Sequence, residues 1–410
     1  MPHPSSKPPL AELVALMATM SSLMALSIDA MLPALPLIGH DLGVVRANDN
    51  QLIISSLFLG MALGLLLYGP LSDSYGRKPP LYAGLGLYLV GCLVSIQAQD
   101  FNQMLVGRVI QGMGLAAPRV ISLAIIRDLF HGEEMARVMS FVMMFFTLVP
   151  ALAPSLGQAI LLVAPWRAIF VLYLCLALLV LVWFGLRQPE TLEPARRTPF
   201  TLARVFGAIG QVLKNLESLG PTLTLGIVFG AILGYLSTAQ QIFQGLYDKG
   251  TQFPIYFGLM ALVFGGASLV NSRLVQLFSI RQLSRWTLGG LTLLSLGFFF
   301  YTLSWEGVPP FWSFLAFLSL SFVCLAILFG NLNAMAMEPL GKMAGIGAAV
   351  VGTLSTILSA GLGTLIGQLY NETLIPLTVS FAALGTVSIV ILSLTTKAGG
   401  RATAGPSVPH

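Results

Sequence analysis

Two ionisable side chains, Asp29 and Arg108, lie inside long apolar stretches of this sequence, where charged groups are rare. Asp29 is the one acidic residue well inside any of these stretches. A charged side chain at the centre of a membrane helix costs about 2.5 kcal/mol or more, so both side chains should face a cavity or an oppositely charged partner. A carboxyl group in such a place exchanges between its protonated and ionised forms when a cation approaches or leaves. The pair therefore predicts proton-transfer chemistry, with a fixed salt bridge between two helices as the alternative.

A second group of charged residues fills the short segment from Gly69 to Lys78, between two apolar stretches. Gly69 and Gly76 allow a tight passage from one helix to the next. Asp73 can accept hydrogen bonds from a helix N-terminus, while Arg77 and Lys78 can pair with acidic side chains or with the C-terminal end of a helix. This spacing predicts a latch that holds helix ends together in one state of the molecule. The alternative is a basic turn that serves only to orient the chain in a membrane.

The elements that carry these residues are predicted to be membrane-spanning helices. Hydrophobic residues make up 56% of the chain and charged residues 9%, with a mean hydropathy of +0.86, whereas soluble domains carry about 25% charged residues. A spanning helix needs roughly 20 mostly apolar residues, and lipid offers no partner for the unpaired backbone groups of other conformations. The sequence therefore predicts an all-α integral membrane protein with twelve spans: 10–36, 51–71, 80–98, 103–126, 138–163, 168–186, 221–243, 254–277, 287–304, 312–334, 344–368 and 374–395.

The basic residues orient these spans, because loops rich in Lys and Arg stay in the cytoplasm. With the N-terminus inside, only Arg46, Arg167 and Lys249 of the 21 Lys and Arg residues fall on the outer side. Both termini are therefore expected in the cytoplasm. The net charge of +5 follows from this topology, and it gives no indication of nucleic-acid binding.

No pattern in the sequence indicates catalysis or metal binding. The three Cys residues fall inside spans without metal-ligand spacing, and the four His residues fall in loops or tails. Intramembrane catalysis usually needs clusters of His, Asp or Ser within the spans, and the chain carries no nucleotide-binding loop. We therefore expect no enzyme, no catalytic residue, no metal site and no ATP-driven pump.

The longest polar stretch follows the sixth span and divides the predicted helices into two groups of six. This division predicts a duplicated six-helix unit. The pairs Gly157-Gln158 and Gly367-Gln368 support the duplication, because they occupy equivalent places near the ends of the fifth and eleventh spans. The expected organisation is a disordered cytoplasmic N-terminus (1–9), an N-terminal six-helix bundle (10–186), a basic cytoplasmic linker (187–220), a C-terminal six-helix bundle (221–395) and a disordered cytoplasmic tail (396–410).

Three motifs in the N-terminal half resemble those of the major facilitator superfamily. The segment from Gly69 resembles its loop Gly-x-Leu-x-Asp-x-x-Gly-Arg-Lys, and the fourth span resembles its second motif, Arg-x-x-Gln-Gly-x-Gly. The fifth span keeps part of the antiporter motif of its exporters, although Val149, Ala153 and Gln158 replace glycines. An Ala-Pro form of this motif is expected in the bicyclomycin and chloramphenicol resistance branch. The residues that carry these resemblances are Gly69, Asp73, Gly76, Arg77 and Lys78 in the loop, Arg108, Gln111, Gly112 and Gly114 in the fourth span, and Pro154 and Gly157 in the fifth.

This resemblance implies a proton-coupled transporter of the bacterial inner membrane, a drug:proton antiporter that exports small amphipathic molecules by alternating access. In the superfamily the arginine of the second motif is implicated in proton transfer, which assigns proton coupling to Asp29 and Arg108. The proton motive force would supply the energy without a cofactor. The expected partners are a small-molecule substrate, protons and the lipid bilayer, and the superfamily implies a monomer. The alternative function is export of an endogenous metabolite, such as a siderophore or a peptide-like natural product.

Polar residues inside the spans are the candidates for a substrate cavity. Each of them could equally satisfy a neighbouring helix. Arg119, which directly follows Pro118, could pair with an anionic group of a substrate or with a carbonyl group that the proline leaves free. The candidate cavity residues are Gln51, Ser55, Arg119, Gln240, Gln241, Asn271 and Asn333.

Overall fold

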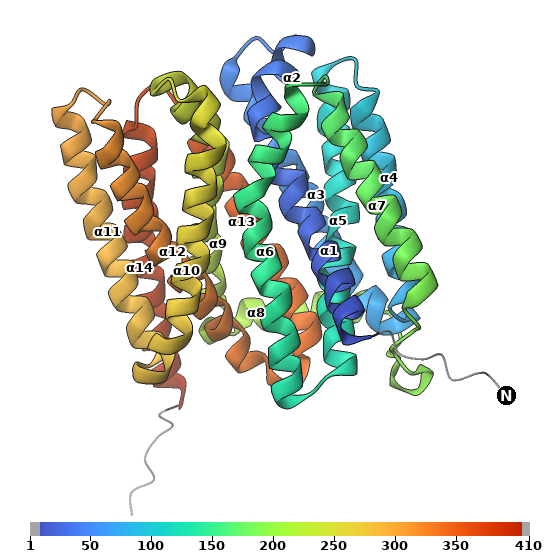
Figure 1. Ribbon diagram of the computed structural model, residues 1–410. Coiled ribbons are helices and arrows are strands. Elements are labelled where there is room, and N and C mark those ends of the chain that lie inside the picture. The colour runs from blue at the N-terminus through green and yellow to red at the C-terminus, as the bar shows by residue number, and fades with distance from the viewer. Residues whose placement is uncertain (1–8, 404–410) are drawn as a thin grey trace, which may run out of the picture. The chain divides into compact units, whose positions relative to one another are not determined.

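The computed structural model describes residues 9–403 of the chain, and of residues 136, 146, 342–344 and 396–403 it describes the backbone alone. The described part consists of helices and the segments that join them, without a β-strand (Figure 1). Within it, twelve helical segments are long and apolar enough to cross a membrane. The prediction of an all-α membrane protein with twelve spans is therefore confirmed.

The helices fall into two compact units. The first comprises the residues up to Thr201 together with Thr251–Leu262, and the second comprises Leu202–Gly250 and the residues from Val263 onward. Helix α10 (Phe253–Leu277) contributes its first residues to the first unit and the others to the second. The remaining helices of the first unit are α1 (Leu10–Asp29), α2 (Leu35–Asp41), α3 (Leu52–Tyr75), α4 (Lys78–Ile96), α5 (Phe101–Leu129), α6 (Gly132–Leu161) and α7 (Arg167–Arg187). Those of the second are α8 (Leu202–Lys214), α9 (Leu216–Gln240), α11 (Ile280–Ser304), α12 (Phe311–Met337), α13 (Ala344–Gln368) and α14 (Ile375–Thr403).

Helix α5 packs directly against α3 and α4 because glycines let the backbones approach closely. A Cβ atom at Gly112 would lie 2.0 Å from the carbonyl oxygen of Leu57 in α3, and one at Gly114 would lie 2.3 Å from the amide nitrogen of Tyr88 in α4. On the facing helix, a Cβ atom at Gly60 would lie 2.0 Å from the carbonyl oxygen of Val109. The two glycines of the second motif therefore have a packing function, and they hold Arg108 at a fixed place between its neighbours.

Helix α3 is longer than predicted, and the segment from Gly69 is mostly helical. The helix passes through Pro70 and ends only at Tyr75, while α4 begins at Lys78 with prolines in its first turn, where a missing N–H group costs no hydrogen bond. Gly76, with φ of +94°, makes the break in the left-handed region that favours glycine. The predicted loop is thus a two-residue connection, and Asp73 lies in the last turns of α3.

Two further helical features fall in the predicted linker and the predicted tail. Residues 202–214 of the predicted linker form α8, whose buried side includes Val205, Ala208 and Val212 while Leu202 and Phe206 are exposed. Helix α14 continues to Thr403, eight residues into the segment expected as a disordered tail, because each residue added to an existing helix gains a hydrogen bond. Residues 1–8 and 404–410, which belong to the two predicted tails, lie outside the described part.

Candidate functional site

Asp29 is the last residue of α1 and lies where this helix is interrupted. The chain continues through a short 3₁₀ turn, Leu32–Ala34, before α2 begins. Pro33 falls in this turn, and it ends the regular helix because it has no N–H group. Asp29 is 5% exposed, and none of the ion pairs found among residues 9–403 involves it. The site therefore presents a buried carboxyl group at a break in a membrane helix.

Arg108 lies beside this break but is bound to neutral acceptors. It donates from Nη2 to the carbonyl oxygen of Ser27 (2.8 Å), from Nε to that of Ile53 (3.1 Å) and from Nη1 to Oε1 of Gln111 (2.5 Å). The side chain is fully buried, with its guanidinium carbon 5.8 Å from the ring centroid of Phe170. The fixed Asp29–Arg108 salt bridge considered as the alternative is not present in this structure. Arg108 instead connects α5 to α1 and α3, and its acceptor in α1, the carbonyl oxygen of Ser27, lies two residues before Asp29.

A chain of hydrogen bonds extends from this arginine and fixes its orientation. The Gln111 side chain, which accepts from Arg108, donates from Nε2 to Sγ of Cys92 in α4 (2.9 Å). The Ser27 hydroxyl donates to the carbonyl oxygen of Leu23 (2.6 Å) and lies 2.6 Å from the hydroxyl of Tyr88. Since a hydroxyl group has one proton to donate, Tyr88 donates in this contact. Gln111, expected from its motif, thus positions Arg108, and Tyr88 is a member of the site that the sequence did not indicate.

The antiporter-like motif packs against the same break in α1. Gly157 in α6 lies so close to Ala30 that a Cβ atom would be 1.7 Å from its carbonyl oxygen. Pro154, one turn earlier, lies inside the same helix and leaves the carbonyl group of Pro150 without its helical partner. The structure therefore brings Pro154, Gly157 and Asp29 to one region of the first unit. The small residue at position 157 is required for the close approach of α6 to α1.

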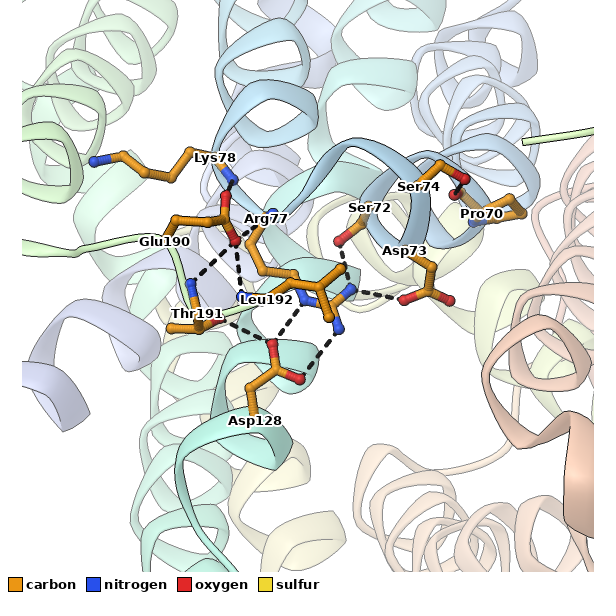
Figure 2. A network of polar contacts seen from close by, with 10 residues as sticks. All are labelled: Pro70, Ser72, Asp73, Ser74, Arg77, Lys78, Asp128, Glu190, Thr191 and Leu192. Atoms are coloured by element: carbon orange, nitrogen blue, oxygen red, sulfur yellow. Dashed lines mark hydrogen bonds and ion pairs between the residues drawn. The ribbon is translucent and has the colours of Figure 1, made fainter. Parts of the chain in front are cut away.

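The charged connection between α3 and α4 forms a second cluster, around Arg77 (Figure 2). Arg77 binds Asp128 at the end of α5 through Nε (2.8 Å) and Nη2 (3.1 Å), a two-point contact. Its Nη1 donates to Oγ of Ser72 (2.9 Å) and to Oδ1 of Asp73 (2.7 Å), and the Lys78 ammonium group donates to the carbonyl oxygen of Gln188 (2.8 Å). Arg77 and Lys78 thereby connect the ends of α3, α5 and α7 within the first unit.

Glu190 is the member of this cluster that the sequence did not reveal. Its Oε1 accepts from the backbone N–H groups of Arg77 (2.8 Å), Thr191 (3.0 Å) and Leu192 (3.0 Å), and its Oε2 accepts from that of Lys78 (3.0 Å). The carboxylate therefore caps the N-terminus of α4, the position that favours a negative charge. The sequence predicts that Asp73 accepts hydrogen bonds from a helix N-terminus. In the structure Glu190 has this position, and Asp73 accepts from the Arg77 side chain instead.

Gly76 and the pKa values of the neighbouring groups fit this arrangement. A Cβ atom at Gly76 would lie 2.6 Å from Oε2 of Glu190, so only glycine leaves room for the carboxylate. Burial alone would raise the pKa of Glu190, but its hydrogen bonds from four backbone N–H groups outweigh burial and lower the pKa below its usual value. Burial would lower the pKa of Arg77, but its hydrogen bonds to Asp128 and Asp73 raise it. Both groups are therefore held in their charged forms.

Arg119 lies in α5, and the side-chain contacts found for its guanidinium group within residues 9–403 are to sulfur. Its Nη1 is 3.4 Å from Sδ of Met24 and 3.8 Å from Sδ of Met61, and its side chain is partly exposed. Gln51 and Ser55 lie at the start of α3, where Gln51 is buried and the Ser55 hydroxyl is 3.5 Å from the Gln51 carbonyl oxygen. These three candidates belong to the first unit, and Arg119 is the one with an ionic group.

The other candidates lie in the second unit. Gln240, at the end of α9, donates from Nε2 to Oε1 of Gln244 (2.7 Å), and Gln241 begins the π-helical turn that follows. Asn271 in α10 donates to Oδ1 of Asn331 in α12 (3.0 Å). The predicted Asn333 is exposed on α12, while Asn331 is buried. Asn271 and Asn333 remain candidate cavity residues, and Asn331, which the sequence did not indicate, is the polar partner of Asn271.

No group of three or more His, Cys, Asp or Glu side chains that could hold a metal ion occurs within the described ranges. Twelve apolar helices in two units, a buried carboxyl group and a charged helix-end cluster are the features to compare with known membrane proteins. The family model of the Major Facilitator Superfamily matches residues 17–364. The chain belongs to this superfamily, whose members are transporters and not enzymes.

Individual relatives agree with this assignment. The chain is 30% identical to the uncharacterized MFS-type transporter YdgK of Bacillus subtilis over 90% of its length and 91% of the relative's. It is 28% identical to a bicyclomycin resistance protein homolog of Haemophilus influenzae, over 90% and 92% of the two lengths. Among solved structures, the xylose transporter XylE of E. coli superposes with a TM-score of 0.71 over 94% of this chain and 97% of that one, at 13% identity. The resemblance found in the sequence is confirmed by the family match, and the fold by XylE.

Proposed function

We propose that this protein is a proton-coupled exporter of small amphipathic molecules, a drug:proton antiporter of the bacterial inner membrane. The bicyclomycin resistance protein homolog supports export of drugs, and the Pro154 and Gly157 remnant of the antiporter motif supports exchange against protons. The protein works by alternating access, with the bundles 10–186 and 221–395 as its moving parts. Both termini face the cytoplasm, and the protein acts as a monomer without a cofactor.

The observation that carries this proposal is the position of Asp29. Its carboxyl group is buried at the interruption of α1, and the neighbouring Arg108 is occupied by the carbonyl groups of Ser27 and Ile53 and by Gln111. A carboxyl group without a fixed cation can take up a proton in one state and release it in another at low cost. Asp29 is therefore the proton-carrying group, and Arg108 keeps the last turn of α1 in place beside it.

The Arg77 cluster has a separate role in this mechanism. Because it ties the ends of α3, α5 and α7 together through charged hydrogen bonds, it stiffens the first unit at the ends of these helices. Charge-assisted and two-point contacts of this kind are among the strongest side-chain interactions. The cluster thereby stabilises one of the transport states, and the unit moves as a rigid body.

The experiment is proton release from inverted membrane vesicles that hold a preset pH gradient, followed by a pH-sensitive dye. Wild type, Asp29→Asn and the control Glu133→Gln are challenged with bicyclomycin, chloramphenicol, ethidium and norfloxacin. Asn keeps the size of the side chain but cannot carry a proton, whereas Glu133 lies in the first turn of α6, at its exposed end. We expect at least one compound to discharge the gradient with wild type and with Glu133→Gln, and none with Asp29→Asn. An equal response from Asp29→Asn would assign proton coupling to another residue.

A further inference from the structure

Two arginines of α5 lie on one face of the helix but have opposite surroundings. Arg108 and Arg119 are eleven residues apart, about three turns and roughly 16 Å along the axis. Both reach α1 and α3: Arg108 contacts the carbonyl groups of Ser27 and Ile53, and Arg119 contacts Met24 and Met61. Arg108 has three oxygen acceptors, whereas the guanidinium contacts of Arg119 within the described part of the chain are to thioether sulfur.

The surroundings of Arg119 do not compensate its charge. A guanidinium group has five N–H donors, and a thioether is only a weak acceptor. None of the ion pairs found between residues 9 and 403 includes Arg119. The neighbouring Ser122 donates its hydroxyl to the Arg119 carbonyl oxygen (3.2 Å) and offers the guanidinium group no acceptor through that bond. The neighbouring described residues therefore offer the Arg119 guanidinium group no anionic partner.

The depth of Arg119 makes this lack of a partner costly. Arg119 is ten residues before the end of α5, about 15 Å along the axis, which is about half the thickness of the hydrocarbon core. A charged side chain at this depth is usually found facing a polar cavity or a partner and commonly marks a substrate pathway. Since Arg119 is a half-buried residue and is not fully enclosed by the chain, a ligand can approach it.

We propose that Arg119 binds an anionic group, a carboxylate or an equivalent oxyanion, of the transported molecule. This inference rests on the proposed transport function and specifies its substrate class: amphipathic anions and zwitterions. The planar guanidinium group binds such an oxyanion through two parallel hydrogen bonds. Met24 and Met61, at the guanidinium group itself, supply flexible apolar contacts for the adjoining part of the molecule, as methionines do at adaptable binding surfaces.

The test measures binding to the purified full-length protein in detergent by equilibrium dialysis, so that it does not depend on transport. The probes are two matched pairs, norfloxacin with its methyl ester and benzylpenicillin with its methyl ester, in which only the carboxylate is changed. The variants are Arg119→Met, which matches the neighbouring thioethers, Arg119→Lys, which keeps the charge, and Arg127→Met, which removes a charge from the exposed end of the same helix. Thermal melting of each variant verifies that it is folded.

We expect wild type to bind at least one acid about tenfold or more tightly than its ester, because a charge-assisted hydrogen bond is worth about that factor in affinity. Arg119→Met should lose this preference, Arg119→Lys should keep part of it, and Arg127→Met should keep all of it. Equal binding of acid and ester by wild type in both pairs, or an unchanged preference in folded Arg119→Met, would overturn the inference. Gradient discharge in the vesicle assay tests the proposed function separately, because a neutral or cationic drug can discharge the gradient whatever Arg119 binds.

Discussion

Glu190 should contribute measurably to the stability of the first unit, because it is the shared acceptor of four backbone N–H groups. Hydrogen bonds at a partly exposed site contribute about 0.5–1 kcal/mol each. Glu190→Ala removes all four, so the expected loss is about 2–4 kcal/mol. Glu190→Gln keeps an oxygen in place of Oε1, which accepts three of the bonds, and loses only the bond from the Lys78 backbone, about 0.5–1 kcal/mol.

The two variants can be compared by thermal unfolding in detergent at neutral pH. A change of 1 kcal/mol shifts Tm by about 2–4 °C for a unit of roughly 200 residues. We therefore expect Tm to fall by about 4 °C or more for Glu190→Ala, and by a clearly smaller amount for Glu190→Gln. A Tm of Glu190→Ala within 1 °C of wild type would refute the capping role. Equal losses in the two variants would show that the charge, and not the number of acceptors, is what matters.

Acid titration gives an independent measurement of the same contact. The pKa of Glu190 is lowered in the folded protein, against an ordinary value near 4.5. The stabilisation by its carboxylate is therefore fully present above about pH 4.5 and is lost as the pH falls through the folded-state pKa. The Tm difference between wild type and Glu190→Gln should shrink between pH 5 and the onset of acid unfolding. A difference that stays constant over this range would contradict the assignment of the pKa shift to the backbone hydrogen bonds.

Two further predictions concern packing and the Arg77 cluster. Gly112→Ala should lower Tm, because its methyl group would meet the Leu57 carbonyl oxygen and overpacking costs about 1–3 kcal/mol. The control is Gly86→Ala in α4, whose methyl group would meet nothing within 4 Å and which should not lower Tm. Arg77→Lys should destabilise although it keeps the charge, since an ammonium group cannot reproduce the two-point contact to Asp128. In a double-mutant cycle with Asp128→Asn the two losses should not add, and simple additivity would show that the two side chains act independently.

The fold could be predicted from the sequence because the determining signal is local. Each spanning helix is marked by a run of about 20 apolar residues. Ten of the twelve predicted spans lie within one helix of the structure or extend beyond it by at most two residues, and the exceptions are 10–36 and 221–243. The departures occur where apolarity is not the deciding property. Helix α8, which has a mixed composition, forms inside the predicted linker without having been expected as a helix. Helix α3 continues through Pro70, although a proline after a glycine is ordinarily a sign that a helix ends.

The sites were predicted less completely, because their members are joined by contacts between distant parts of the chain. Arg77 and Lys78 were identified by their motif, but their partner Glu190 is more than a hundred residues away and lies in a polar stretch with other acidic residues. The sequence shows that a buried cation needs partners, and it does not show which ones. Arg108 illustrates this, because an acidic partner was considered while two backbone carbonyl groups and an amide fill the role.

Helical geometry explains both the different surroundings of Asn331 and Asn333 and the significance of Arg119. Residues two apart point about 200° from each other on a helix, so Asn331 is buried against Asn271 while Asn333 is exposed. The sequence of a span does not show which way a polar side chain points. Residues eleven apart return to the same side. Arg119 therefore faces the same two helices as Arg108, and the difference between the two arginines lies in what those helices offer: oxygen acceptors beside Arg108, and methionine sulfur beside Arg119. A fixed cation that residues 9–403 leave without an anion is suited to select a substrate that carries one.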